Sequence, residues 1–201
     1  NIWTAGRLTV DQKNYLALQP NKLEIGEFSL VHGSPRDPIW EYVVSNSAAV
    51  ASFNHFDTQR CLVGHSHIPF ICRPKTADLT EFRAPALDDA VPLNNDRMII
   101  NPGGVGQPRD GDPRASYAVY DSVDETITHH RTEYDISKTQ EKMRQHELPK
   151  FLIDRLTYGR EPQGEPIPPR RRTGAQGPSN PQNRTTAELA RFPSCSRAGV
   201  R

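Results

Sequence analysis

Short apolar runs alternate with polar loops rich in glycine and proline along residues 1–158. Two of these runs, residues 28–31 and 62–63, are followed by histidine beside glycine, and a third, residues 98–101, ends in Asn101 ahead of Pro102-Gly103-Gly104. Their length and composition predict short buried strands. Between the first two runs, residues 47–56 carry apolar side chains at helical spacing. The pattern therefore predicts a strand–helix–strand unit, typical of an α/β layer.

Weaker patterns complete the expected secondary structure. Residues 23–25 and 28–31 flank Gly26-Glu27, which predicts a hairpin. A helical pattern within residues 1–20 has Thr9 and Asp11 as candidate caps. We expect further strands at 69–73, 81–83, 90–93, 116–120 and 126–131, and surface helices at 137–145 and 148–158.

The last 43 residues differ from the rest in composition. Residues 159–201 hold eight arginines and three glutamates, and the whole chain is +1, which leaves −4 on residues 1–158. The segment also holds seven of the eighteen prolines and few large apolar residues. Such a segment cannot bury enough apolar surface to offset its chain entropy. We expect an α/β domain at 1–158 and a disordered Pro/Arg-rich tail at 159–201.

Cysteine usage and hydropathy bear on the cellular location of the protein. Cys61, Cys72 and Cys195 form no disulfide framework, and the first two are predicted to be buried on strands, where they could lie close across a hairpin. A reducing, cytoplasmic location fits this usage. No apolar run is long enough to span a membrane, and no signal peptide is evident. Because the sequence begins with Asn1, we expect it to be a piece of a longer protein.

The stretch from Cys61 to Phe70 carries the main candidate chemistry. An apolar strand is expected to end at Gly64 and to be followed by His65 and His67. In extended chain, side chains two residues apart point to the same side, about 6–7 Å apart at their bases. The two rings could therefore share one metal ion or hold one each of two neighbouring ions.

A second histidine follows a strand in the same way. His32-Gly33 comes directly after the run 28–31. Two strands that end in histidine and glycine suggest one site at the carboxyl edge of a sheet. Ser34 and Ser66 neighbour these histidines only in sequence, and no nucleophile elbow is present, so serine catalysis is excluded.

The loop at residues 102–113 is rich in glycine, yet it does not fit a nucleotide-binding motif. The Gly-Lys-Ser/Thr ending of a P-loop is absent, and Arg109 stands where a dinucleotide fingerprint needs glycine. One interpretation is a tight irregular crossing between strands. The alternative is that the loop lines the histidine site and sets Asn101 or Arg109 near a substrate phosphate, which the guanidinium fork of arginine suits.

The remaining basic and histidine residues are interpreted as non-functional. His129 and His130 fall on one strand and face opposite sides, while His55 and His146 lie on helices without partners. The run at 170–172 could bind anions, but no aromatic residues are interleaved with it. Nucleic-acid binding is therefore not expected.

Taken in order, three motifs resemble the calcineurin-like metallophosphoesterases, especially their small bacterial and archaeal phosphodiesterases. They are His32-Gly33, Gly64-His65-Ser66-His67 and the segment from Asn101 to Arg109. The resemblance covers about residues 1–158. It implies that this chain is the C-terminal part of a two-sheet αββα sandwich.

The resemblance also implies a function and a cofactor. His32 and His65 would bind one divalent ion and His67 a second, and neutral imidazole suits Mn, Fe, Ni or Zn. The two ions would hold a bridging hydroxide that attacks phosphorus in line. The expected substrate is a small phosphodiester, with no membrane or nucleic-acid partner, and assembly into a homo-oligomer is left open.

The chain departs from the family pattern in two ways. Gly104 stands where the family often has serine, which affects the hydrogen bonding of the loop. The Asp-x-His, Gly-Asp-x-x-Asp and Gly-Asn-His-Asp/Glu motifs are absent, and with them a bridging carboxylate. Three imidazoles hold two divalent ions poorly, so no catalytic residue is assigned within this chain. We expect it to bind metal weakly and to lack turnover by itself.

Two other functions stay open at this point. One is a phosphoesterase fold that has lost catalysis and serves as a scaffold for a partner protein. The other is a truncated fragment that does not fold independently. The retained histidines at 32, 65 and 67 favour the enzyme over the scaffold, since unused ligands would be free to change.

Overall fold

The computed structural model describes residues 2–160 of the 201-residue chain. The expected domain at 1–158 lies in this part. The predicted disordered tail, with its arginine run, and Cys195 fall outside the described residues, apart from positions 159 and 160.

The N-terminal helical pattern forms two short helices, α1 (Ile2–Arg7) and α2 (Val10–Ala17). Thr9 caps α2, as predicted. Its hydroxyl accepts a hydrogen bond from the Gln12 N–H, and the Gln12 side chain accepts one from the Thr9 N–H. This reciprocal capping box satisfies two N–H groups and separates the two helices.

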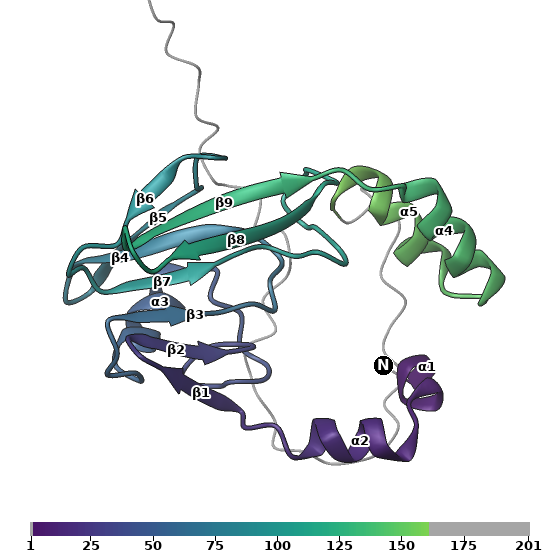
Figure 1. Ribbon diagram of the computed structural model, residues 1–201, viewed down its shortest axis with the longest axis horizontal. Coiled ribbons are helices and arrows are strands. Elements are labelled where there is room, and N and C mark those ends of the chain that lie inside the picture. The colour runs from purple at the N-terminus through teal and green to yellow at the C-terminus, as the bar shows by residue number, and fades with distance from the viewer. Residues whose placement is uncertain (1, 161–201) are drawn as a thin grey trace, which may run out of the picture. The chain divides into compact units, whose positions relative to one another are not determined.

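A six-stranded sheet carries the three predicted core strands at its centre (Figure 1). The strand order is β1-β2-β3-β7-β4-β5. The strands are β1 (Lys22–Ile25), β2 (Phe28–Val31), β3 (Arg60–Leu62), β7 (Met98–Asn101), β4 (Phe70–Thr76) and β5 (Leu79–Arg83). The predicted hairpin is confirmed, with Leu23 opposite Leu30. Because β2, β3 and β7 are parallel, their carboxyl ends meet at one edge of the sheet.

A second, three-stranded sheet has the order β6-β9-β8 (Figure 1). It consists of β6 (Ala90–Pro92), β9 (Thr126–Thr132) and β8 (Ala115–Asp121). Both of its pairings are antiparallel. The predicted two-sheet α/β architecture is therefore confirmed.

Apolar side chains pack on both faces of the six-stranded sheet. Helix α3 (Asn46–Phe53) covers one face, where Ala49 and Phe53 join the side chains of Cys61 and Ile99. The other face packs against the small sheet through Met98, Ile100 and residues of β6 and β9. Both interfaces meet on β7, whose four residues are all buried. Strand β7 is thus the structural centre of the fold.

Strand β7 also separates the two described cysteines. Cys61 and Cys72 both pair with Ile99, from opposite sides of that strand. They are therefore not neighbours across a hairpin, and two strand spacings of about 4.8 Å each exceed the reach of a disulfide. Both thiols are free and buried, and burial raises the pKa of Cys61 to about 12 and that of Cys72 to about 11.

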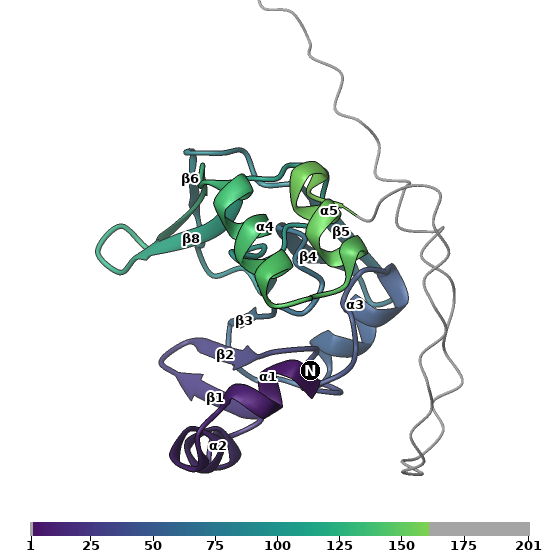
Figure 2. The ribbon, with the colours of Figure 1, turned by 90° about the vertical axis from the view of Figure 1, so that its right-hand side faces the viewer.

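Two further helices, α4 (Ile136–Gln145) and α5 (Lys150–Tyr158), pack against each other (Figure 2). Gly159 ends α5 in a left-handed conformation, and its carbonyl accepts a hydrogen bond from the Gly111 N–H at 3.0 Å. This contact ties α5 to the glycine-rich loop that follows β7. Sequence analysis interpreted α5 as a surface helix, but it buries Ile153, Arg155 and Leu156.

Candidate metal and phosphate site

Three loops meet at the shared carboxyl edge of β2, β3 and β7. The Gly64 N–H donates to the His32 carbonyl at 3.0 Å, which joins the first loop to the second. The Asn101 side-chain amide donates to the Gly64 carbonyl and to the Ser66 hydroxyl, both at 3.0 Å, which joins the third. The backbone around the histidines is therefore held by a connected set of hydrogen bonds.

The first loop presents His32 to solvent. Its turn is closed by the Gly33 N–H, which donates to the Pro38 carbonyl at 2.7 Å. Ser34 is fully buried; its hydroxyl accepts from the Asp37 N–H at 2.9 Å and bonds the Glu41 carboxylate. An added Cβ at Gly33 would lie 2.7 Å from the Asp37 carbonyl oxygen, so glycine is required there.

His32 and His65 lie against each other. His32 Nε2 and His65 Nδ1 are 2.9 Å apart, and the ring centroids are 4.7 Å apart. Tyr42 stacks on the His65 ring, with 4.0 Å between centroids and 9° between planes. The predicted convergence of rings from two separate strand ends is confirmed for this pair.

The second loop does not have the extended backbone that we expected. His65 and His67 both adopt left-handed conformations, with φ of 61° and 59°. Non-glycine residues rarely occupy this region, and they do so mostly where the surrounding structure enforces it. The estimate of side-chain spacing from strand geometry is therefore wrong for this pair.

His67 is oriented by the third loop. Its Nδ1–H donates to the Gln107 carbonyl at 2.6 Å, which leaves Nε2 with its lone pair. A histidine that binds a metal ion through one ring nitrogen typically donates the N–H of its other ring nitrogen to such an acceptor. The close approach of His67 explains why glycine stands at position 104, where the family often has serine. A Cβ added to Gly104 would lie 2.9 Å from His67 Cβ.

Replacing Gly104 with alanine should displace His67. The new methyl group has no space, so we expect the Nδ1–Gln107 hydrogen bond to weaken and stability to fall by about 1–3 kcal/mol. The histidine ring nitrogens can be followed by long-range ¹⁵N–¹H NMR. Gly106→Ala is the matched control, since nothing lies within 4 Å of its added Cβ. Unchanged His67 ring signals in Gly104→Ala would contradict this packing.

The electrostatic surroundings favour neutral imidazole. Burial lowers the pKa of His65, and the nearby charges of His32 and Arg109 lower it further. Burial also lowers the pKa of His67, against a raising effect of its bond to Gln107, and Arg109 and Arg155 add to the lowering. The neutral ring is the form that binds a metal ion.

Asn101 and Arg109 have different positions in the site. Asn101 is fully buried, and its side-chain Oδ1 also accepts a hydrogen bond from the Gly103 N–H at 2.8 Å. It therefore holds the loops together from behind and offers no free group to a substrate phosphate. Arg109 is half-buried, and its charge acts on both His65 and His67.

The other histidines have structural surroundings. His129 is fully buried and its Nε2–H donates to the Asn101 carbonyl at 3.0 Å, while His130 pairs with Asp88 at 2.7 Å. His55 is exposed, and the His146 ring contacts Trp3.

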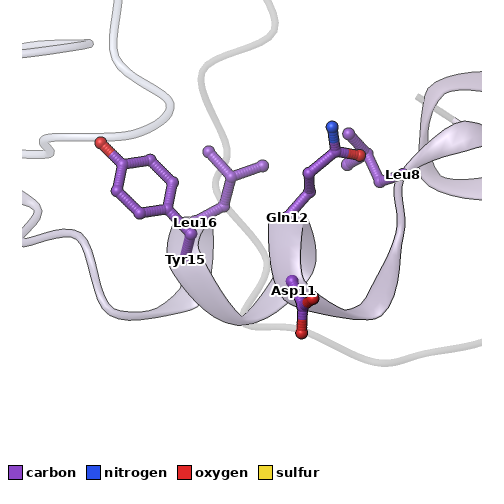
Figure 3. A pocket seen from close by; sticks show the side chains of 5 residues that line it. All are labelled: Leu8, Asp11, Gln12, Tyr15 and Leu16. Atoms are coloured by element: carbon purple, nitrogen blue, oxygen red, sulfur yellow. The ribbon is translucent and has the colours of Figure 1, made fainter.

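Two pockets differ in their relation to these residues. A pocket of about 380 Å³ between α2 and the β1–β2 hairpin includes His32 in its wall. The pocket in Figure 3 is lined only by α2 residues and Leu8, without any histidine. Only the first adjoins the candidate site.

The residues present fit part of a metal site. Two nitrogens about 2.1 Å from one ion and at right angles about it are about 3 Å apart, which matches His32 and His65. Yet within residues 2–160 no three His, Cys, Asp or Glu side chains are arranged to hold one ion. The histidine pair therefore fits two positions of a coordination shell, and the full donor set of a dimetal centre is not present in this part of the chain.

Comparison with known proteins identifies the fold and the family. A crystal structure of a metallophosphoesterase from Sphaerobacter thermophilus superimposes with a TM-score of 0.75 at 43% identity, over 79% of this chain and 66% of that one. The chain belongs to the calcineurin-like metallophosphoesterase superfamily. No family model matches it.

Two other relatives set the extent of the match. An uncharacterized protein of Methanocaldococcus jannaschii is 41% identical over 130 residues, which is 64% of this chain and 50% of that protein. A hypothetical protein of Pyrococcus horikoshii shares the fold with a TM-score of 0.59 at 19% identity, over 79% of this chain and 58% of that one. This metallophosphoesterase chain thus spans about half of its curated relative and two-thirds or less of each structural one.

Sequence reasoning missed three residues that shape the site: Tyr42, Gln107 and Arg155. Residues 39–44 gave no clear pattern, and Gln107 acts mainly through its backbone carbonyl. Arg155 lies 48 residues beyond Gln107, on a helix that looked solvent-exposed. A helical stripe of Phe151, Leu152 and Arg155 offers no signal that the arginine faces inward.

Proposed function

We propose that this chain is part of a metal-dependent phosphoester hydrolase, a phosphodiesterase acting on a small substrate. The observation that supports this most is the His32–His65 pair, whose facing nitrogens are 2.9 Å apart at the joined carboxyl ends of two parallel strands. The family's divalent ions, when bound, supply Lewis acidity at the phosphate and activate water for attack on phosphorus.

The residues of this chain would have different roles in the site. His32 and His65 hold one ion, with Tyr42 stacked on His65 to fix its ring. His67 offers Nε2 to a second ion, since Nδ1 is committed to the Gln107 carbonyl. The pocket beside His32 includes apolar side chains such as Leu16 and Leu30, which suit an organic group of the substrate.

The proposal includes a role for the part of the relatives that this chain does not span. A metal centre with two ions needs carboxylate ligands to balance their charge, and the described residues supply none in position. We propose that a longer form, extended by the corresponding segment of its relatives, completes the site.

Activity and metal content test this proposal together. The longer form should hydrolyse bis(p-nitrophenyl) phosphate with Mn²⁺, whereas the 201-residue chain should bind Mn²⁺ weakly and turn over no substrate. A longer form that binds Mn²⁺ but remains inert on phosphodiesters and phosphomonoesters would contradict the enzymatic function. No metal in either form would contradict the site itself.

A further inference from the structure

Arg155 is a buried cation that the metal site does not require. Its side chain is only 3% exposed on α5, and its guanidinium Nη1 donates to Gln107 Oε1 at 3.2 Å. The same Gln107 accepts the His67 Nδ1–H through its backbone carbonyl. One residue therefore links α5 to the histidine that faces the proposed second ion.

Arg109 is a second cation in the same place. Within residues 2–160 it forms no ion pair or hydrogen bond, and its Nε–H is buried without a partner. Burying such a donor without an acceptor is costly, since desolvation is not offset. Elsewhere in the same loop, Asp110 and Asp112 already pair with Arg131 and Arg114.

The two guanidinium groups act on each other. Burial lowers the pKa of Arg155 to about 10, and the charge of Arg109 contributes to this lowering. The two like charges therefore repel each other at this place. An anion with several oxygens would offset this repulsion and accept from the Arg109 Nε–H, which has no partner among residues 2–160.

We propose that Arg109 and Arg155 form an anion-binding pair beside His67 that holds a phosphate group of the substrate. That the natural ligand is a phosphoester rests on the proposed function. The binding of an oxyanion by the pair does not, because it requires no metal. Arg155 is therefore assigned as a substrate-binding residue on α5.

Inorganic phosphate provides a metal-free test. The 201-residue chain, in EDTA, is titrated with phosphate while the arginine Nε–Hε cross-peaks are followed by ¹⁵N NMR. We expect the Arg109 and Arg155 peaks to move, and Arg155→Gln to weaken phosphate binding about tenfold. Arg144→Gln is the matched control, because Arg144 is exposed on α4 and, among the described residues, its side chain pairs only with Glu141.

Further variants separate binding from folding. Arg155→Lys keeps the charge but not the planar fork, so it should lose less affinity than Arg155→Gln. Because Arg109 lies on a loop, the Arg109→Gln variant tests the pair even if Arg155→Gln proves unstable. It should lower phosphate affinity about as much as is expected for Arg155→Gln. The proposed pair would be overturned if phosphate shifts neither arginine cross-peak. It would also be overturned if phosphate binds Arg109→Gln as tightly as the unchanged chain.

Metal binding measured on the same proteins keeps the two proposals apart. Arg155→Gln should bind Zn²⁺ as tightly as the unchanged chain. Loss of phosphate binding with Zn²⁺ binding retained supports the anion pair. Phosphate binding without any Zn²⁺ binding would leave the anion pair standing and contradict the metal site.

Discussion

Replacing His32 with alanine is expected to weaken Zn²⁺ binding to this chain about 100-fold, and His65→Ala should have the same effect. Losing an outer-sphere partner of a metal ligand already costs about 10–100-fold, so losing a ligand should reach the upper end. Because both rings would hold one ion, the double variant should be little worse than either single one. Competition with a chromogenic chelator measures all of these affinities.

The control for this prediction is His55→Ala. His55 is exposed just beyond the end of α3, and its Nδ1 lies 2.8 Å from the Ala51 carbonyl oxygen. Its removal should leave Zn²⁺ affinity within twofold, roughly the scatter of such measurements. Equal losses in His55→Ala and His32→Ala would indicate binding spread over surface histidines, against a site at the strand ends.

Ile99→Ala should destabilise the domain by about 3 kcal/mol, the typical cost of truncating a fully buried isoleucine. Ile99 is fully buried at the centre of the large sheet, between Cys61 and Cys72 on the flanking strands, and it packs in the cluster that includes α3. Strands on both sides hold the backbone in place, so the cavity cannot collapse easily. Urea unfolding followed by circular dichroism measures the change.

Val123→Ala provides the comparison for the core. Val123 is 88% exposed in the turn between β8 and β9, so its truncation should change stability by less than about 0.5 kcal/mol. A loss below about 1 kcal/mol for Ile99→Ala would mean that β7 is not the centre of a packed core.

The strands could be predicted because burial dictates their composition. Residues 28–31 and 98–101 are short apolar runs bounded by turn residues, and only a sheet interior accommodates them. The parallel arrangement of β2 and β3 followed from the intervening helix α3. The strand–helix–strand pattern therefore predicted that His32 and His65 lie close together.

The finer geometry of the site depends on contacts that composition does not encode. The left-handed backbone at His65 and His67 lies against Asn101 at the end of β7 and Gly104 in the loop after it, far along the chain from the histidines. Likewise Arg155 looked like one more polar residue of a surface helix. Only the packing of α5 on the loop after β7 turns it toward His67.

Within residues 2–160, no helix is both long enough and apolar enough to cross a membrane. The sequence led to the same expectation through its lack of long apolar runs. The predicted cytoplasmic location stays a prediction.

Anomalous X-ray diffraction can show directly whether His32 and His65 share one metal ion. A crystal of the 201-residue chain soaked in Zn²⁺ is measured on both sides of the zinc absorption edge. We expect an anomalous peak within bonding distance of both His32 Nε2 and His65 Nδ1, about 2.1 Å from each. A well-occupied peak elsewhere, with these two nitrogens still hydrogen-bonded to each other, would contradict it.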